Sequence, residues 1–265
     1  MPLLRNFFPN LHTMSLNSTS RFSNRVENYV KYRPGYPVEI IQYLIDNYNL
    51  TTDRKLADIG SGTGISAEMF LIHGFSVAGV EPNAEMREKS VQLLQKYAAF
   101  VAVNGTAENT NLDANSVDAV ICGQSFHWFD HEKCKIEFKR ILKPGGVVVI
   151  IWNERKTSSA FEIEYEDLII KHGSDYKKVT QRNIDPKDIA AFFHPSTNRI
   201  KTFFNRQLFD FDGLLGRLLS SSYMPTEHDE GFDEMKKNLR LLFDKFEETG
   251  QIKIEYDTRV YSGQL

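Results

Sequence analysis

The chain has 265 residues, of which 41% are hydrophobic, and carries a formal net charge of −3. This length and apolar content allow one large domain, or one domain with an elaborated lid, and are sufficient for a full core. The weak negative charge disfavours a nucleic acid as partner. The two cysteines, Cys122 and Cys134, indicate neither a disulfide framework nor a zinc site, so we expect no metal. The longest apolar run, 147–152, is far shorter than the roughly 18 to 20 residues of a membrane helix, which predicts a soluble protein without a membrane partner.

The first 26 residues differ in composition from the rest of the chain. Residues 1–26 contain three arginines together with several Ser and Asn, and no acidic residue comes before Glu27. This composition loosely resembles an organelle transit peptide. The alternatives are a flexible leader, which we expect, or initiation upstream of Met14. We therefore expect a cytoplasmic protein, with organelle targeting as the open alternative.

From residue 38 to residue 152, predicted helices and strands alternate. The segment 38–48 has apolar residues at the spacing of one helix face. Short apolar runs predict strands at 55–59, 75–80, 99–103, 117–122 and 147–152. Helices are predicted at 65–73 and after the cap residues Asn83 and Asp130. This alternation predicts parallel pairing with right-handed crossovers, and hence a doubly wound α/β sheet.

Beyond Asn153 the alternation breaks. The segments 161–171 and 232–246 have the pattern of amphipathic helices, and we interpret the looser region between them as part of a lid insertion. Two further segments, 199–211 and 252–261, are rich in β-branched and aromatic residues, which favours strands.

The most informative stretch is the glycine-rich loop after the first predicted strand. Three alternating glycines, Gly60, Gly62 and Gly64, lack the Cβ atoms that would hold a ligand away from the backbone. A predicted helix follows, and its unpaired N–H groups favour electron-rich atoms. The loop is therefore predicted to bind a cofactor.

Three neighbouring features predict which nucleoside this cofactor contains. Asp58 places a carboxylate at the end of the first strand, which suits an ammonium group. Glu81 closes the second strand, where an acidic side chain accepts two hydrogen bonds from a ribose diol. The segment 105–108 follows the third strand, where an adenine edge would lie. Together these features describe S-adenosylmethionine better than a dinucleotide.

Several ordered motifs resemble a known family. Asp58-Ile-Gly-Ser-Gly-Thr-Gly64, Gly79-Val-Glu-Pro-Asn83 and Leu142-Lys-Pro-Gly-Gly146 are similar to motifs of the class I S-adenosylmethionine-dependent methyltransferases, of the "methyltransferase domain 11" type. The resemblance covers roughly residues 25–155. Tyr32-Arg-Pro-Gly-Tyr-Pro37 and Gln124-Ser-Phe-His-Trp-Phe-Asp130 resemble a subgroup that contains trans-aconitate methyltransferase-like proteins.

The resemblance implies a fold and a division of the chain. It implies a Rossmann-like, mostly parallel seven-stranded sheet that ends in an antiparallel C-terminal hairpin and carries a helical lid insertion. The expected parts are a leader at 1–26, a cofactor-binding core with an N-terminal helical cover at 27–152, lid segments at 153–198 and 212–250, and C-terminal strands at 199–211 and 251–265.

The predicted cofactor contacts come from the loops that follow the strands. We expect S-adenosylmethionine to contact Asp58, Gly60, Ser61, Gly62, Thr63, Gly64, Glu81, Pro82, Asn83, Met86, Thr106, Ala107, Glu108, Gln124 and Ser125. Some of these residues also have plain structural interpretations. Asn83 suits a helix cap, Met86 suits the core, and 106–108 suits an ordinary polar loop.

The residues nearest to the methyl acceptor are harder to predict. His127 is the candidate general base, although it could equally serve local packing, and a carboxylate acceptor needs no base. The candidate substrate contacts are Tyr32, Arg33, Trp128 and Trp152. Arg33 suits a carboxylate clamp, for the cofactor or for an acidic substrate, or a surface ion pair.

These features predict an enzyme that methylates a small, possibly acidic molecule and releases S-adenosylhomocysteine. We expect transfer to oxygen of a carboxylate or hydroxyl, with nitrogen and carbon acceptors left open. The alternatives are a non-catalytic S-adenosylmethionine-binding protein and a nicotinamide-dependent oxidoreductase. The chain is expected to be a monomer or a homodimer.

Overall fold

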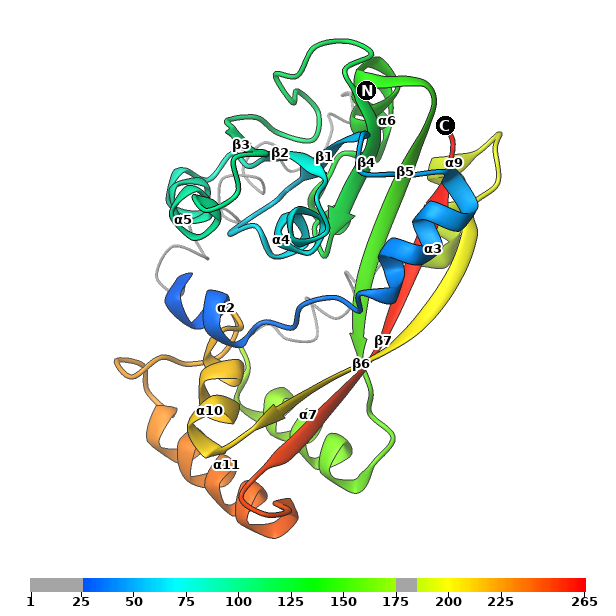
Figure 1. Ribbon diagram of the computed structural model, residues 1–265. Helices are drawn as coiled ribbons and strands as arrows, with labels where there is room; N and C mark the ends of the chain where they lie inside the picture. Colours follow the sequence, from blue (N-terminus) through cyan, green and yellow to red (C-terminus); the bar gives the residue numbers. More distant parts are fainter. Residues whose placement is uncertain (1–25, 175–184) are drawn as a thin grey trace, which may run out of the picture.

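The computed structural model describes residues 26–174 and 185–265. These residues form one seven-stranded sheet with helices on both faces and a group of helices at one end (Figure 1). The strands are β1 (Lys55–Ile59), β2 (Ser76–Val80), β3 (Phe100–Val103), β4 (Val117–Gly123), β5 (Leu142–Arg155), β6 (Arg199–Phe209) and β7 (Ile252–Gly263). The helices are α2 (Val26–Tyr32), α3 (Glu39–Tyr48), α4 (Ile65–Ile72), α5 (Ala84–Leu94), the 3₁₀ helix η1 (Phe126–Trp128), α6 (His131–Ile141), α7 (Ala160–His172), α9 (Pro186–Phe193), α10 (Phe211–Leu219) and α11 (Phe232–Phe246).

The strand order confirms the predicted fold class. The order is β3-β2-β1-β4-β5-β7-β6, in which β1 to β5 pair in parallel and β7 pairs antiparallel with both β5 and β6. The chain moves outward from β1 in one direction to β3 and then in the other direction from β4. The carboxyl ends of β1 and β4 therefore meet where the strand order reverses, which is where ligands bind in sheets of this kind.

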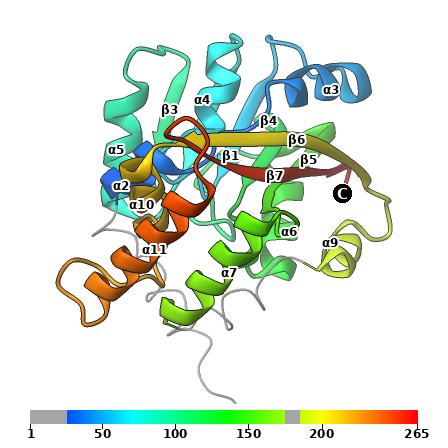
Figure 2. The same ribbon diagram turned by 90° about the horizontal axis from the view of Figure 1, so that it is seen from below.

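The period-two alternation of the strands sends neighbouring side chains to opposite faces of the sheet. Leu56 packs with Leu44 of α3 and Phe70 of α4 on one face. Ala57, the next residue, packs with Phe138 of α6 on the other face. Figure 2 shows α3, α4 and α5 on one side of the sheet and α6 and α9 on the other. Burial on both faces explains why the parallel strands read as continuous apolar runs.

A third apolar cluster lies beyond the carboxyl ends of the parallel strands. It joins α7, α10 and α11 to the ends of β6 and β7, and includes Tyr165, Leu214, Leu239 and Tyr256. The register explains its position: β7 pairs with β5 from Gly263 to Tyr256, then continues with β6 alone as far as Ile252. The two-stranded ribbon therefore extends past the end of β5 and carries the helical group (Figure 1). We call α7, α10 and α11 the lid helices.

The structure corrects the sequence prediction in the second half of the chain. The stretch that was predicted to be loose contains α9, which begins at Pro186 after the cap Asp185. Phe192 and Phe193 of α9 pack in the core on the α6 face of the sheet, so α9 lies apart from the lid helices. Phe211, expected to end a strand, begins α10. The expected leader at 1–26 falls outside the described residues except for Val26.

Helix α2 is fixed to the lid by a close contact with α10. A Cβ atom on Gly216 would lie 2.0 Å from the ring of Tyr32, so only glycine allows this approach. We expect Gly216→Ala to lower the melting temperature, because inserting a methyl group into a packed contact costs about 1–3 kcal/mol. Alanine normally favours a helix over glycine by about 1 kcal/mol, so an unchanged or raised melting temperature would contradict this contact. Gly35→Ala is the control, since a Cβ atom there meets nothing within 4 Å.

In the described ranges, every helix is too short or too polar to cross a membrane. Within the same residues, no group of three or more His, Cys, Asp and Glu side chains is arranged to hold a metal ion.

Candidate functional site

The glycine loop lies at the point where the strand order reverses, and its three glycines have different roles. All three have positive φ, at +65° for Gly60, +58° for Gly62 and +91° for Gly64. A Cβ atom on Gly60 would lie 2.7 Å from Cβ of Ser125, and one on Gly64 would lie 2.6 Å from Cδ1 of Leu94. A Cβ atom on Gly62 would meet nothing within 4 Å. Two of the glycines therefore allow close packing, whereas Gly62 presents bare backbone to open space.

Glu81 ties the glycine loop to the end of β2. Its Oε2 accepts a hydrogen bond from the backbone N–H of Gly62 at 2.9 Å, and its Oε1 accepts one from the N–H of Asn83 at 2.9 Å. Burial raises the pKa of Glu81, and these backbone donors oppose the shift. Each carboxylate oxygen can still accept a further hydrogen bond. Glu81 therefore shapes the loop and keeps acceptor capacity beside the open face of Gly62.

Asp58 is fully buried at the end of β1. Its Oδ2 accepts hydrogen bonds from the hydroxyls of Ser61, at 2.9 Å, and Ser66, at 2.7 Å. Among the residues that the structure describes, no hydrogen bond reaches its Oδ1, and the hydroxyl of the adjacent loop residue Thr63 is likewise buried without a partner. Burial raises the pKa of Asp58 to about 6. A buried acceptor of this kind is costly unless a donor reaches it, which fits the ammonium group of the predicted cofactor.

The segment after α2 crosses the ends of the strands and brings Tyr36 to this site. A Cβ atom on Gly123, at the end of β4, would lie 2.7 Å from the Tyr36 hydroxyl and 2.9 Å from the Ser66 hydroxyl. The carbonyl of Gly35 accepts hydrogen bonds from the side-chain amides of Asn153, at 3.0 Å, and Asn205, at 2.9 Å. Burial and the nearby Asp58 raise the pKa of Tyr36 well above its ordinary value. Sequence reasoning placed Tyr36 in a covering segment and missed Asn205.

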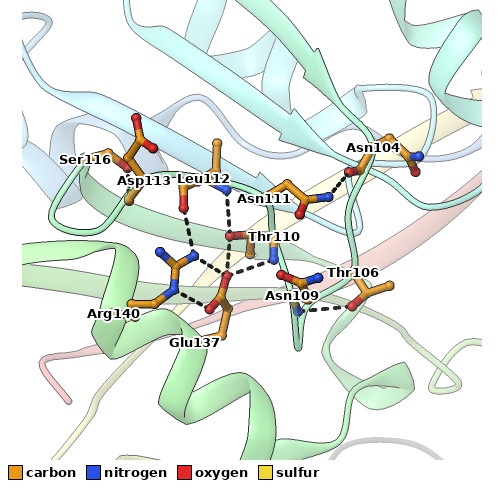
Figure 3. A network of polar contacts seen from close by, with 10 residues as sticks. All are labelled: Asn104, Thr106, Asn109, Thr110, Asn111, Leu112, Asp113, Ser116, Glu137 and Arg140. Carbon is orange, nitrogen blue, oxygen red and sulfur yellow. Dashed lines mark hydrogen bonds and ion pairs between the residues drawn. The ribbon is translucent and has the colours of Figure 1, made fainter.

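The loop after β3 is held by a polar network (Figure 3). Glu137 of α6 accepts a hydrogen bond from the N–H of Thr110 at 2.8 Å and forms an ion pair with Arg140 at 2.7 Å. Arg140 also donates to the carbonyl of Leu112 at 2.7 Å. The hydrogen bonds from Arg140 lower the pKa of Glu137 to about 2, so the network remains charged at neutral pH. The network therefore fixes the residues that directly follow the predicted adenine loop.

The residues predicted to contact adenine point in different directions. Ala107 is buried in the core of the α6 face. Glu108 accepts a hydrogen bond from the N–H of Asp130 at 2.9 Å, which links the loop to the start of α6. Thr106 is exposed, and its hydroxyl accepts from the N–H of Asn109 at 3.1 Å. Contact of these three residues with a cofactor stays a prediction.

The first residues after β4 join three strand ends. Gln124 has a φ of +56°, and its side-chain oxygen accepts a hydrogen bond from the N–H of Asn153 in β5. Ser125 donates to the carbonyl of Ile59 at 2.7 Å. Both side chains thus brace the ends of β1, β4 and β5. Their predicted contact with the methionine part of the cofactor stays a prediction.

Three of the predicted acceptor-side residues lie together. The ring centroid of His127 is 4.4 Å from that of Trp128 and 5.1 Å from that of Trp152, with the Trp152 ring edge-on. Trp128 keeps 37% of its surface exposed. The turn of η1 and the end of β5 therefore form an aromatic group with one imidazole at its centre.

The other two predicted substrate contacts lie toward the lid. Tyr32 packs against α10 and against Phe209, with ring centroids 6.5 Å apart. Arg33 donates to the carbonyl of Ser220, just after α10, at 3.0 Å. Contact with a substrate stays a prediction for both residues.

The remaining predicted cofactor residues lie around the start of α5. Asn83 caps this helix, since its side-chain oxygen accepts from the N–H of Met86 at 2.9 Å. Met86 is buried, whereas Pro82 is exposed. The cap role predicted for Asn83 is thus confirmed, and its contact with a cofactor stays a prediction.

The sequence matches a known family over the part of the chain that builds this site. The family described as "Methyltransferase domain" matches residues 57–150. An uncharacterised methyltransferase of Mycobacterium tuberculosis is 35% identical over 152 residues, which cover 57% of this chain and 60% of the relative. An uncharacterised methyltransferase of Schizosaccharomyces pombe is 31% identical over 138 residues, which cover 52% of this chain and 54% of the relative. The chain thus spans about three fifths, or less, of the length of these relatives.

Solved structures share the fold over a longer stretch. A structure from Anaeromyxobacter dehalogenans, described as a candidate type II methyltransferase, has a TM-score of 0.65 at 18% identity and covers 88% of this chain and 98% of its own. A candidate methyltransferase from an antibiotic biosynthesis pathway of Anabaena variabilis has a TM-score of 0.60 at 22% identity and covers 89% of this chain and 99% of its own. At these identities the likeness concerns the fold alone.

Proposed function

We propose that the chain is a class I S-adenosylmethionine-dependent methyltransferase that methylates a small molecule at a carboxylate or hydroxyl oxygen. The observation that carries the proposal is the bare backbone of Gly62, which lies in the loop that follows Asp58 and donates a hydrogen bond to the carboxylate of Glu81. The likeness to trans-aconitate methyltransferase-like proteins stays a prediction.

The residues present fit the cofactor. We assign the unpartnered Oδ1 of Asp58 to its ammonium group and the remaining acceptor capacity of Glu81 to its ribose. The loop at 106–108 would border the adenine, and the network around Glu137 keeps that loop in place. When bound, S-adenosylmethionine supplies an electrophilic methyl carbon. The protein supplies the position and alignment of the acceptor, which can lower the barrier by roughly 7 to 11 kcal/mol.

The need for a base depends on the acceptor. A carboxylate attacks without losing a proton, whereas a hydroxyl must lose one. His127 is the residue we assign to this proton, because its imidazole can accept one near neutral pH and lies between the aromatic rings of Trp128 and Trp152.

The test is methyl transfer itself. The full chain is incubated with S-adenosylmethionine that carries a tritiated methyl group and with a panel of small acids, phenols and amines. Label recovered in an ester or an ether supports the proposal. An empty panel, together with tight binding of S-adenosylmethionine in isothermal titration, would instead favour a non-catalytic binding protein, and preference for NAD would favour an oxidoreductase.

Binding of S-adenosylhomocysteine should weaken as the pH falls through 6. Burial raises the pKa of Asp58 to about 6, above its ordinary value, so the free folded protein takes up a proton there. That proton must leave before the carboxylate can pair with an ammonium group, and binding is therefore favoured above the pKa. Titrations at pH 7 and pH 5 should differ by about tenfold in affinity.

Asp58→Asn provides the control for this pH dependence. The variant should bind S-adenosylhomocysteine more weakly at pH 7 and lose most of the difference between the two pH values. Glu81, whose pKa burial also raises, would account for a small remainder. An undiminished pH dependence in Asp58→Asn would assign the titration to another group.

A further inference from the structure

Within the described part of the chain, two arginines at the lid have no carboxylate partner. Arg33 follows α2 and Arg217 lies in α10. Among residues 26–174 and 185–265, neither guanidinium forms an ion pair with an acidic side chain. Both residues are half-buried.

The contacts of the two arginines converge on the end of α10. Arg33 Nη2 donates to the carbonyl of Ser220 at 3.0 Å, while its Nε is buried without a partner. Arg217 donates weakly from Nη1 to the Ser220 hydroxyl at 3.4 Å and from Nε to the Tyr256 hydroxyl at 3.3 Å. The five N–H groups of each guanidinium are therefore only partly used.

The surroundings of this pair supply neutral groups in place of a counter-charge. The guanidinium of Arg33 lies 5.1 Å from the ring centroid of Tyr29. Tyr165, Tyr223 and Tyr256 interact electrostatically with Arg217. The carboxylate of Glu166 on α7 forms an ion pair with Arg155, whose guanidinium lies 5.1 Å from the ring centroid of Tyr165.

A buried carboxylate elsewhere in the protein is compensated by neighbouring cations. The carboxylate of Asp118 is paired with both Arg54, at 3.1 Å, and Lys143, at 2.7 Å. Removing a cation from water without a partner costs several kcal/mol, and two neighbouring cations also repel each other. Burial and the nearby Arg217 lower the pKa of Arg33, whereas the tyrosines around Arg217 raise the pKa of that group against the effect of burial. The free-energy cost of holding two arginines together without a carboxylate is explained if an anion from outside the protein binds to them.

The arginine pair is continuous with the cofactor side of the site. Arg33 interacts electrostatically with Tyr36, and Tyr36 in turn with Asp58. Arg33 and Tyr36 lie on the same short segment, which Asn153 and Asn205 hold at Gly35. Arg217 lies on the lid helix α10 and donates to the hydroxyls of Tyr256, in β7, and Ser220, at the end of α10. The pair thus extends from the segment beside the predicted cofactor site to a lid helix.

Resting on the proposed function, we propose that the methyl acceptor is an anion, a carboxylate or a phosphate ester, bound between the guanidinium groups of Arg33 and Arg217. Guanidinium forms two parallel hydrogen bonds with either anion, and the unused donors of the pair are suited to such a contact. Arg217 was not among the residues predicted from the sequence. It would make the lid helix α10 the element that selects charged over neutral acceptors.

The experiment is a binding panel on the full chain saturated with S-adenosylhomocysteine. Mono-, di- and tricarboxylates, phosphate monoesters and the neutral carboxamide analogue of each carboxylate are titrated at constant ionic strength. We expect at least one anion to bind and its neutral analogue to bind at least tenfold more weakly. The carboxylate and phosphate arms of the panel identify which anion the site takes.

Variants then test the arginines. Arg217→Leu and Arg33→Leu should each weaken binding of the selected anion at least tenfold and leave the affinity for S-adenosylhomocysteine within twofold of the wild-type value. Arg206→Leu removes the same charge from an exposed position on β6 and should bind the anion like the wild type. Arg217→Lys keeps the positive charge but lacks the planar guanidinium, so it should bind the selected anion at least threefold more weakly than the wild type. It replaces Arg217→Leu in the test if the leucine variant does not fold.

Several results would overturn the inference. One is that no anion in the panel binds better than its neutral analogue. Another is that the arginine variants bind the anion like the wild type. A tenfold loss of S-adenosylhomocysteine affinity in folded Arg217→Leu would assign the pair to the cofactor instead. Failure of the proposed function looks different: the wild-type chain would then either not bind S-adenosylhomocysteine or bind the anion without transferring a methyl group to it from S-adenosylmethionine.

Discussion

A Gly62→Val variant is expected to keep its fold and to lose affinity for S-adenosylmethionine by at least 100-fold. The added side chain enters open space, since a Cβ atom at this position meets no protein atom within 4 Å. It therefore occupies the volume in which we place the cofactor. The affinity is measured by isothermal titration, and the fold by circular dichroism.

The control for this variant has to carry the same backbone strain. Valine at the φ of +58° found for Gly62 costs on the order of 1–2 kcal/mol or more, whatever the ligand does. Gly145→Val is the matched change, because Gly145 has a φ of +81° and a Cβ atom there also meets nothing within 4 Å. Gly145 lies near the amino end of the paired part of β5, far along the strand from the glycine loop. Native-like Gly62→Val with wild-type affinity would show that the cofactor does not lie against this loop.

Glu81→Gln should weaken S-adenosylmethionine binding by about 1.5–3 kcal/mol, which corresponds to roughly 10- to 150-fold. The carboxylate accepts from the N–H groups of both Gly62 and Asn83. A carboxamide has a single acceptor oxygen, so one of these backbone donors loses its partner and the ribose loses a charged acceptor. The dissociation constant from isothermal titration checks the size of the loss.

Glu85→Gln is the matched control for Glu81→Gln. Glu85 is an exposed acid in the first turn of α5, so its exchange removes the same charge close to the site without touching the loop. We expect its affinity to equal that of the wild type. A loss below about twofold in Glu81→Gln, or an equal loss in both variants, would mean that Glu81 is not the ribose partner.

The parallel half of the fold could be predicted from the sequence because local pattern and tertiary structure agree there. The first strand was predicted at Lys55–Ile59, where β1 is found, and the cap residues Asn83 and Asp130 begin α5 and α6 as expected. In such a sheet, burial on both faces requires unbroken apolar runs, and each helix between strands needs a cap. Both requirements leave strong local signals.

The second half gave weaker signals because its structure depends on distant contacts. Helix α9 has eight residues and α10 nine, too few for a sustained helical period, and α10 contains two glycines. Gly216 looks like a helix breaker in the sequence, yet it is required for the approach of Tyr32 from almost two hundred residues away. No local pattern records such a contact.

The candidate site shows the same division. The glycine loop, Asp58 and Glu81 stand at strand ends, so their positions follow from the order of the strands. The pairing of Arg33 with Arg217 could not be derived, because Arg217 reaches Arg33 only through the packing of α10 against α2. Arg217 gave one signal in the sequence, because it is a cation amid the apolar residues of an amphipathic helix.

The ribbon of β6 and β7 contributes to both halves of the molecule. One stretch of the ribbon pairs with β5 inside the seven-stranded sheet, and the next stretch packs against the lid helices. A slip of its pairing by one residue would turn every lid-facing side chain outward, while a change within the helices leaves the cofactor half untouched. Relatives that use other acceptors are thus free to differ in the lid helices, provided that the strand pairing of the β6–β7 ribbon is kept.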